Sequence, residues 1–106
     1  MAKAKNEGNP SEFLAAAKRE GFTASARDGV VDVLKRFPPG DRAAYFAAEQ
    51  AAYSLIGMCP RVRPGSVWGT DSGSVGGAAG IAHGYMRLHV SGVALRFAKA
   101  VAKASQ

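Results

Sequence analysis

The segment "GTDSGSVGGAAG", residues 69–80, combines an Asp–Ser pair with closely spaced glycines. Such residues could form a nucleophile loop or a phosphate-binding loop. A serine nucleophile needs a general base that a carboxylate orients, and Asp71 is the only acidic residue after residue 60. A P-loop needs a lysine directly after its last glycine, and no lysine lies between Lys35 and Lys99. We therefore expect a glycine-rich hairpin loop, with an anion-binding nest of backbone amides as the alternative.

The histidines and the cysteine do not form a metal site by their spacing. His83 and His89 lie six residues apart in a stretch that alternates like a strand, which separates them by about 20 Å. The single Cys59 excludes an internal disulfide and a cysteine-based zinc site, and we interpret it as a small packed apolar residue. We expect no catalytic residue, no metal and no cofactor, so the protein is predicted not to be an enzyme.

Three helices are expected before residue 60. Asn9 followed by proline is typical of a capped helix start, and the first helix covers residues 9–20. Apolar residues at helical spacing predict a second helix over residues 25–37. Asp41 caps a third helix that runs to about residue 57 and is apolar around most of its circumference, which is typical of a central, buried helix.

The second half of the chain predicts strands and a last helix. "SVWGT", residues 66–70, is a short strand candidate, and "HGYMRLHV", residues 83–90, alternates between apolar and polar side chains. We expect these two segments to pair across the glycine-rich loop. Ser91 caps a final helix, roughly residues 92–104, whose polar side is basic.

Together these elements predict an α+β, mainly helical domain with three N-terminal helices, a small glycine-rich antiparallel β-hairpin and a C-terminal amphipathic basic helix. Residues 1–8 are expected to be a flexible N-terminus and residues 9–106 one compact domain. The expected buried residues are Phe13, Leu34, Phe37, Tyr45, Ala52, Leu55, Ile56, Leu88 and Phe97.

Charge is distributed unevenly along the chain. Residues 1–59 hold eight Lys or Arg against seven Asp or Glu, whereas residues 60–106 hold six against one. Such asymmetry favours an acidic partner, either a protein surface or nucleic acid. No apolar stretch is long enough to span a membrane, no signal peptide is visible, and a cytoplasmic location is expected.

Two kinds of binding protein remain. The first docks its basic C-terminal half on an acidic protein surface as an inhibitor or modulator of a nucleic-acid-handling complex; a phage-borne anti-CRISPR protein is one concrete form. The alternative binds nucleic acid directly, mostly through phosphates and without reading sequence. No small-molecule substrate is evident. Arginine, tryptophan and tyrosine often anchor interfaces, and the residues expected to bind the partner are Arg61, Arg63, Trp68, Tyr85, Arg87, Arg96, Lys99 and Lys103.

Overall fold

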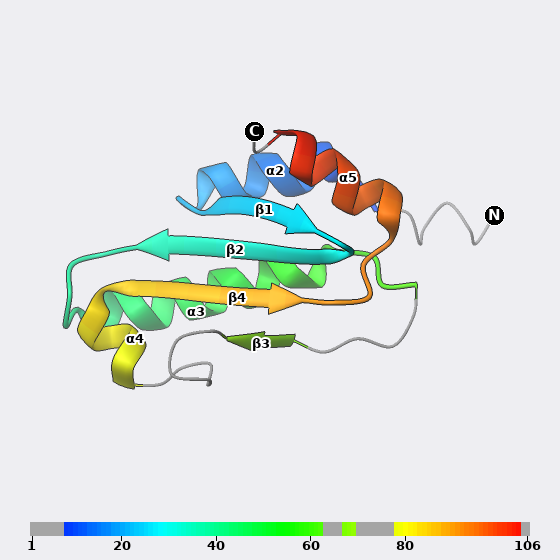
Figure 1. Cartoon of the computed structure of the whole chain (residues 1–106). Helices are drawn as coiled ribbons and strands as arrows, with labels where there is room; N and C mark the ends of the chain where they lie inside the picture. Colours follow the sequence, from blue (N-terminus) through cyan, green and yellow to red (C-terminus); the bar gives the residue numbers. More distant parts are fainter. Residues whose placement is uncertain (1–7, 63–66, 70–77, 105–106) are drawn as a thin grey trace.

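The computed structural model describes residues 8–62, 67–69 and 78–104 of the 106-residue chain. In these residues an antiparallel sheet is backed by helices, and the architecture is α+β as predicted (Figure 1). The elements in chain order are α2 (Pro10–Arg19), β1 (Thr23–Arg27), β2 (Val30–Arg36), α3 (Arg42–Gly57), β3 (Val67–Gly69), α4 (Ala78–His83), β4 (Tyr85–Val90) and α5 (Leu95–Ala104).

The first and third of the predicted N-terminal helices are confirmed as α2 and α3. A side-chain oxygen of Asn9 accepts a hydrogen bond from the backbone N–H of Glu12 at 3.0 Å. Asp41 accepts one from the backbone N–H of Ala44 at 2.9 Å. Each bond satisfies one of the N–H groups that a helix start leaves without a partner. The local sequence therefore fixes where both helices begin.

The predicted second helix, residues 25–37, is wrong, because this part of the chain is the β1–β2 hairpin. The two strands join at Asp28 and Gly29, whose φ angles are 54° and 78°. Two consecutive positive φ angles characterise the tight turn that fits the twist of a hairpin, and Asp-Gly is a favoured pair for it. The β-branched side chains of Val31 and Val33 then point into the core, where both are fully buried.

The sheet has the order β1-β2-β4-β3, and every neighbouring pair is antiparallel. The predicted pairing of residues 66–70 with the strand after the glycine-rich loop is confirmed, since Val67 pairs with Val90 and Gly69 with Leu88. The connection is more than a simple hairpin loop, because its end forms α4. Residues 70–77 lie outside the described residues, and with them Asp71 and most of the segment predicted as an anion-binding nest, whose last residues, 78–80, begin α4.

Gly84 joins α4 to β4 at a position where a residue with a side chain would be strained and would clash with its neighbour. Its φ is 78°, and a Cβ added there would lie 2.5 Å from the carbonyl oxygen of Phe37. The glycine carbonyl in turn accepts the backbone N–H of Phe37 at 2.9 Å. The end of β2 and the start of β4 are thereby fixed against each other, which sets the register of the central strand pair.

The helices cover one face of the sheet. Strand residues that share this face, including Val31, Val33, Leu88 and Val90, are fully buried. They pack under α3, while α2 and α5 lie along β1 (Figure 1). The predicted buried residues are confirmed with two exceptions. Leu34 is half-buried because its register position beside Arg87 is on the other, open face, and Phe37 packs at the sheet end, edge-on to Tyr45.

The final helix begins at Leu95, later than the predicted start after Ser91. Between the two, Val93 donates its backbone N–H to the Gly29 carbonyl at 3.0 Å and forms a β-bridge with Arg61. The bridge holds Val93 in an extended conformation, and the Ala94 carbonyl accepts the first helical hydrogen bond from the Ala98 N–H at 2.9 Å, so α5 starts only after Ala94. Within the described residues, no helix combines the length and apolar character needed to cross a bilayer.

Candidate binding surfaces

The structure distributes the eight predicted partner-binding residues over separate places. Arg96, Lys99 and Lys103 lie exposed on α5. Tyr85 and Arg87 lie on β4, on the open face of the sheet.

The other three lie elsewhere. Arg61 is exposed between α3 and β3. The backbone of Trp68 pairs with His89 at the β3–β4 contact. Arg63 lies outside the described residues. The predicted set is therefore not one cluster: it divides into a helix surface and a sheet surface.

The outer side of α5, with Arg96, Lys99 and Lys103, is named the α5 basic face here. Its opposite side carries Phe97, Ala98 and Val101, which are buried against β1 and α2. The Phe97 ring meets that of Phe13 of α2 edge-on, with 5.4 Å between ring centroids. This packing fixes the orientation of the helix and keeps the basic face in solvent.

No acidic residue accompanies these cations on α5. Among the described residues, neither Lys99 nor Lys103 forms an ion pair. A small groove of about 160 Å³ beside Lys99 is lined by Arg27 and Asp28 from the β1–β2 turn. The turn thus brings one cation, Arg27, and one carboxylate, Asp28, to the edge of the α5 basic face, although the sequence prediction had assigned both residues to a helix.

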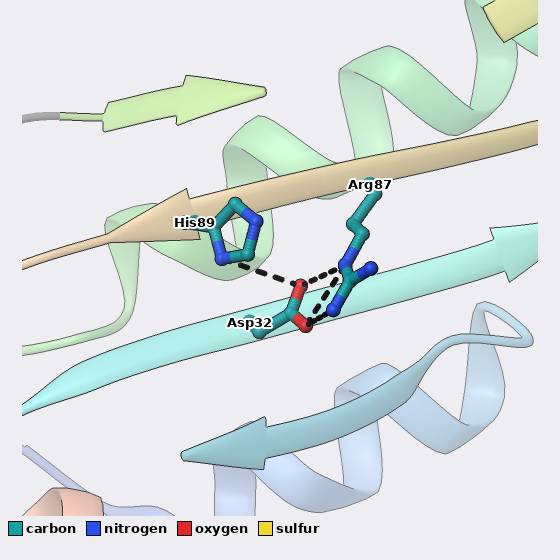
Figure 2. A network of polar contacts seen from close by, with 3 residues as sticks. All are labelled: Asp32, Arg87 and His89. Carbon is teal, nitrogen blue, oxygen red and sulfur yellow. Dashed lines mark hydrogen bonds and ion pairs between the residues drawn. The ribbon is translucent and has the colours of Figure 1, made fainter. Parts of the chain in front are cut away.

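The open face of the sheet carries a network of three side chains, Asp32, Arg87 and His89, shown in Figure 2. The Arg87 guanidinium donates to both carboxylate oxygens of Asp32, from Nε at 3.3 and 3.1 Å and from Nη2 at 2.9 Å. The Nδ1 atom of His89 lies 3.7 Å from Asp32 Oδ1. The side chains of Asp32 and His89 are only 15% and 12% exposed, whereas that of Arg87 is 43% exposed.

The electrostatics of this network keep Arg87 charged and disfavour charge on His89. Hydrogen bonding to Asp32 raises the pKa of Arg87. Burial lowers the pKa of His89 below its ordinary value because it disfavours the imidazolium; Asp32 opposes this and Arg87 adds to it. The network is thus a carboxylate–guanidinium pair with an adjoining imidazole that favours the neutral form.

A groove of about 520 Å³ runs over this network, lined also by Ser25 and Val30. Ala26, Arg27 and Asp28 line both this groove and the small one beside α5. The sheet surface and the helix surface therefore meet at the β1–β2 turn, which gives the protein one continuous polar flank.

Nucleophilic or metal chemistry finds no support in the described residues. Cys59 is buried, as predicted, and burial raises its pKa to about 12, so the thiolate needed for attack is not formed at neutral pH. His83 ends α4 and does not lie on the strand as predicted; its ring is tilted against Tyr85 at 6.4 Å. In the part of the chain that the structure describes, no group of His, Cys, Asp and Glu side chains could hold a metal ion.

Asp32 and Arg27 were missed as surface residues because the segment that contains them was predicted as a helix. The signal in the sequence that could have identified them is the Asp28–Gly29 pair, because Asp-Gly favours a tight hairpin turn between two strands. Fold and surfaces together define an α+β protein with a helix-backed antiparallel sheet and a polar flank. Comparisons with protein-family models, curated proteins and solved structures find no match.

Proposed function

We propose that this protein is a non-enzymatic, cytoplasmic binding protein that docks its α5 basic face on an acidic protein surface. In this role it inhibits or modulates a nucleic-acid-handling complex, as a phage-borne anti-CRISPR inhibitor does. The observation that carries the proposal is the exposure of Lys99 and Lys103 on α5, where neither forms an ion pair among the described residues. Their charge is available to an acidic partner, which steers association and fixes orientation.

Direct nucleic-acid binding is the second candidate, and the open face of the sheet favours it. Tyr85, Arg36 and Arg87 lie on neighbouring positions of β2 and β4, where an aromatic ring and cations stand on a sheet surface that no described helix covers. Single-stranded nucleic acids bind such surfaces by stacking bases on aromatic rings and by phosphate contacts. On this candidate, binding weakens steeply with salt.

A paired set of variants tests the proposal. Lys99→Glu/Lys103→Glu reverses two charges on α5, and Lys18→Glu/Arg19→Glu makes the same change in net charge in the last turn of α2. A labelled peptide of glutamates serves as the acidic probe, and its anisotropy is measured with each variant. We expect at least a tenfold loss of affinity for the α5 variant and a smaller loss for the α2 control. Equal losses would show that only net charge matters and would contradict the proposal.

The two candidates are separated by titrating labelled single-stranded and double-stranded DNA and RNA at about 50 and 200 mM salt. No binding at the lower salt supports the protein partner. Binding that falls by about a hundredfold or more between the two salts supports direct phosphate contact by several cations and overturns the first candidate.

A further inference from the structure

The outer face of α3 is exposed and uncharged over its whole length. At about 100° per residue its members span an arc about 120° wide that is centred on Gln50. Phe46 and Tyr53 on this face are each 48% exposed, although both are large and mostly apolar. The face, named the α3 outer face here, consists of Ala43, Phe46, Ala47, Gln50, Tyr53, Ser54 and Gly57.

The fold of the monomer does not use these side chains. The buried side of α3 is made by other residues, among them Tyr45, Ala52 and Leu55. The one described ring contact of Phe46 is edge-on with Tyr45 at 5.6 Å, at the border of the two sides. Contiguous exposed apolar surface of this kind is characteristic of interaction sites.

We propose that the α3 outer face binds the same face of a second copy of this chain. The two α3 helices lie antiparallel, with the two-fold axis passing beside Gln50. In such a pair, a residue that precedes Gln50 in one copy lies in the same layer as the residue of the other copy that follows Gln50 by the same number of positions. Phe46 then meets Ser54 of the other copy, and Ala47 meets Tyr53. Large side chains face small ones in both layers, and the two Gln50 amides can donate to each other.

Charge favours the same arrangement. A chain with a net charge of +6 repels a second copy, and the α3 outer face is a surface where two copies approach without opposing like charges. The first turn of α3 contains Arg42 and no acid, and its last turn contains no basic residue. Asp41 at the N-cap complements the positive end of the helix dipole within one chain, whereas the last turn has no cation of its own. In the antiparallel pair each Arg42 lies near the carbonyl end of the other helix, where a cation is favourable.

The area of the face sets the strength of this dimer. A half-exposed aromatic side chain offers about 100 Å², so four of them contribute about 400 Å² across the two copies. With the smaller residues the interface reaches about 1,000 Å², which is below the range of stable interfaces and typical of transient ones. We therefore expect a dimer that forms in the range of tens to hundreds of micromolar, on the order of −5 to −7 kcal/mol.

Disulfide crosslinking tests the register. Gln50→Cys places two thiols at the two-fold axis, within reach of each other. Ala43→Cys is the matched control, because its two thiols lie about 21 Å apart along the helix pair. Native Cys59 is buried and is retained in both variants. Under mild oxidation at about 200 µM protein we expect Gln50→Cys to dimerise at least tenfold faster than Ala43→Cys. Equal rates would overturn the antiparallel arrangement.

A mixture of Ala43→Cys and Gly57→Cys sharpens this test. The two positions lie opposite each other in the proposed pair, and a Cβ at Gly57 meets no atom within 4 Å. The mixture is therefore expected to crosslink, whereas neither variant does so alone. Crosslinking of each variant with itself instead of the mixture would indicate parallel helices and contradict the proposal.

Sedimentation measures the association of the unmodified chain. The weight-average mass is expected to rise between about 20 and 500 µM protein, and Phe46→Glu/Tyr53→Glu is expected to remain monomeric. That variant lowers the net positive charge, which by itself reduces repulsion, so lost association reports the lost contact. Its circular dichroism should match the wild type. A wild-type chain that stays monomeric at about 500 µM would overturn the proposal.

Discussion

The open face of the sheet and the α5 basic face carry the same kind of charge in opposite circumstances. On the sheet, Arg87 is held by two oxygens of Asp32, and the pair is joined by a mostly buried His89. On α5, Lys99 and Lys103 are exposed and form no ion pair among the described residues, although Asp28 lines the groove beside Lys99. Arg87 is engaged in an ion pair within the molecule, whereas no ion pair of Lys99 or Lys103 is described.

This difference separates what charge does for the fold from what it does for binding. A guanidinium paired across two strands contributes to the association of β2 with β4, and its loss leaves a carboxylate without its partner. An exposed lysine on a helix contributes little to stability. A basic residue type alone therefore does not show whether its charge is engaged within the fold; an ion pair with a carboxylate does.

The largest effect in this comparison is expected from Arg87→Met. It leaves the Asp32 carboxylate, 15% exposed, without its guanidinium and should lower the free energy of unfolding by about 1–2 kcal/mol. Asp32→Asn should cost less, because the 43% exposed Arg87 side chain can regain water. Urea unfolding measures both. A larger loss for Asp32→Asn would show that the carboxylate has a structural role beyond this pair.

A smaller effect on the free energy of unfolding is expected when the pH is lowered. Because the pKa of His89 is lower in the folded state than its ordinary value of 6.5, the unfolded chain binds the proton more readily. The contribution of His89 to stability is therefore complete above about pH 6.5 and is lost as the pH falls toward its folded pKa. His89→Gln should flatten the decline in the free energy of unfolding between about pH 7.5 and 5.5.

His83→Gln is the control for this pH dependence. His83 is exposed at the end of α4 and is not a member of the Asp32–Arg87–His89 network, so its replacement removes one histidine and leaves that network intact. If both variants reduced the pH-dependent loss of stability equally, that loss would come from the net charge of the chain and not from the Asp32–Arg87–His89 network.

The smallest effect on stability is expected where the effect on binding is largest. Lys99→Gln/Lys103→Gln should change the free energy of unfolding by no more than about 0.5 kcal/mol, because neither ammonium has a described partner to lose. Thermal unfolding of this variant beside Arg87→Met tests the comparison directly. Destabilisation as large as that of Arg87→Met would place the α5 lysines in the fold and remove the basis for calling them a partner surface.

Apart from the β3–β4 pairing, the parts of the fold that the sequence predicted are those with local causes. The cap residues Asn9 and Asp41 bond to backbone N–H groups three residues away, and this spacing is visible in the sequence. The alternation of residues 83–90 also predicted which side chains of β4 are buried. The exposed cations of α5 followed from helical periodicity in the same way.

The error over residues 25–37 has a physical reason. Val30, Val33 and Leu34 fit the spacing of a helix and also belong to a strand whose two faces differ in burial. Contacts with other strands favour the strand over the helix, and these contacts are not visible in the periodicity of the segment. Val33 pairs with Ala24 on one side and with Leu88 on the other. The Asp32–Arg87 pair depends on the same contacts. Its members are 55 residues apart, so neither residue alone indicated the other.

The sheet order also determines when this sheet can be completed during synthesis. β2 gains its first neighbour, β1, across a two-residue turn, but its second neighbour, β4, is translated only after α3, β3 and α4. At 5–20 residues per second, about 50 intervening residues leave one edge of β2 open for roughly 3–10 s. In that interval α3 can already cover the apolar face of the hairpin, while the edge of β2 still offers its N–H and C=O groups to other chains. For a nascent chain, the emergence of α3 therefore ends the exposure of the apolar face, but the exposure of the β2 edge ends only when β4 emerges.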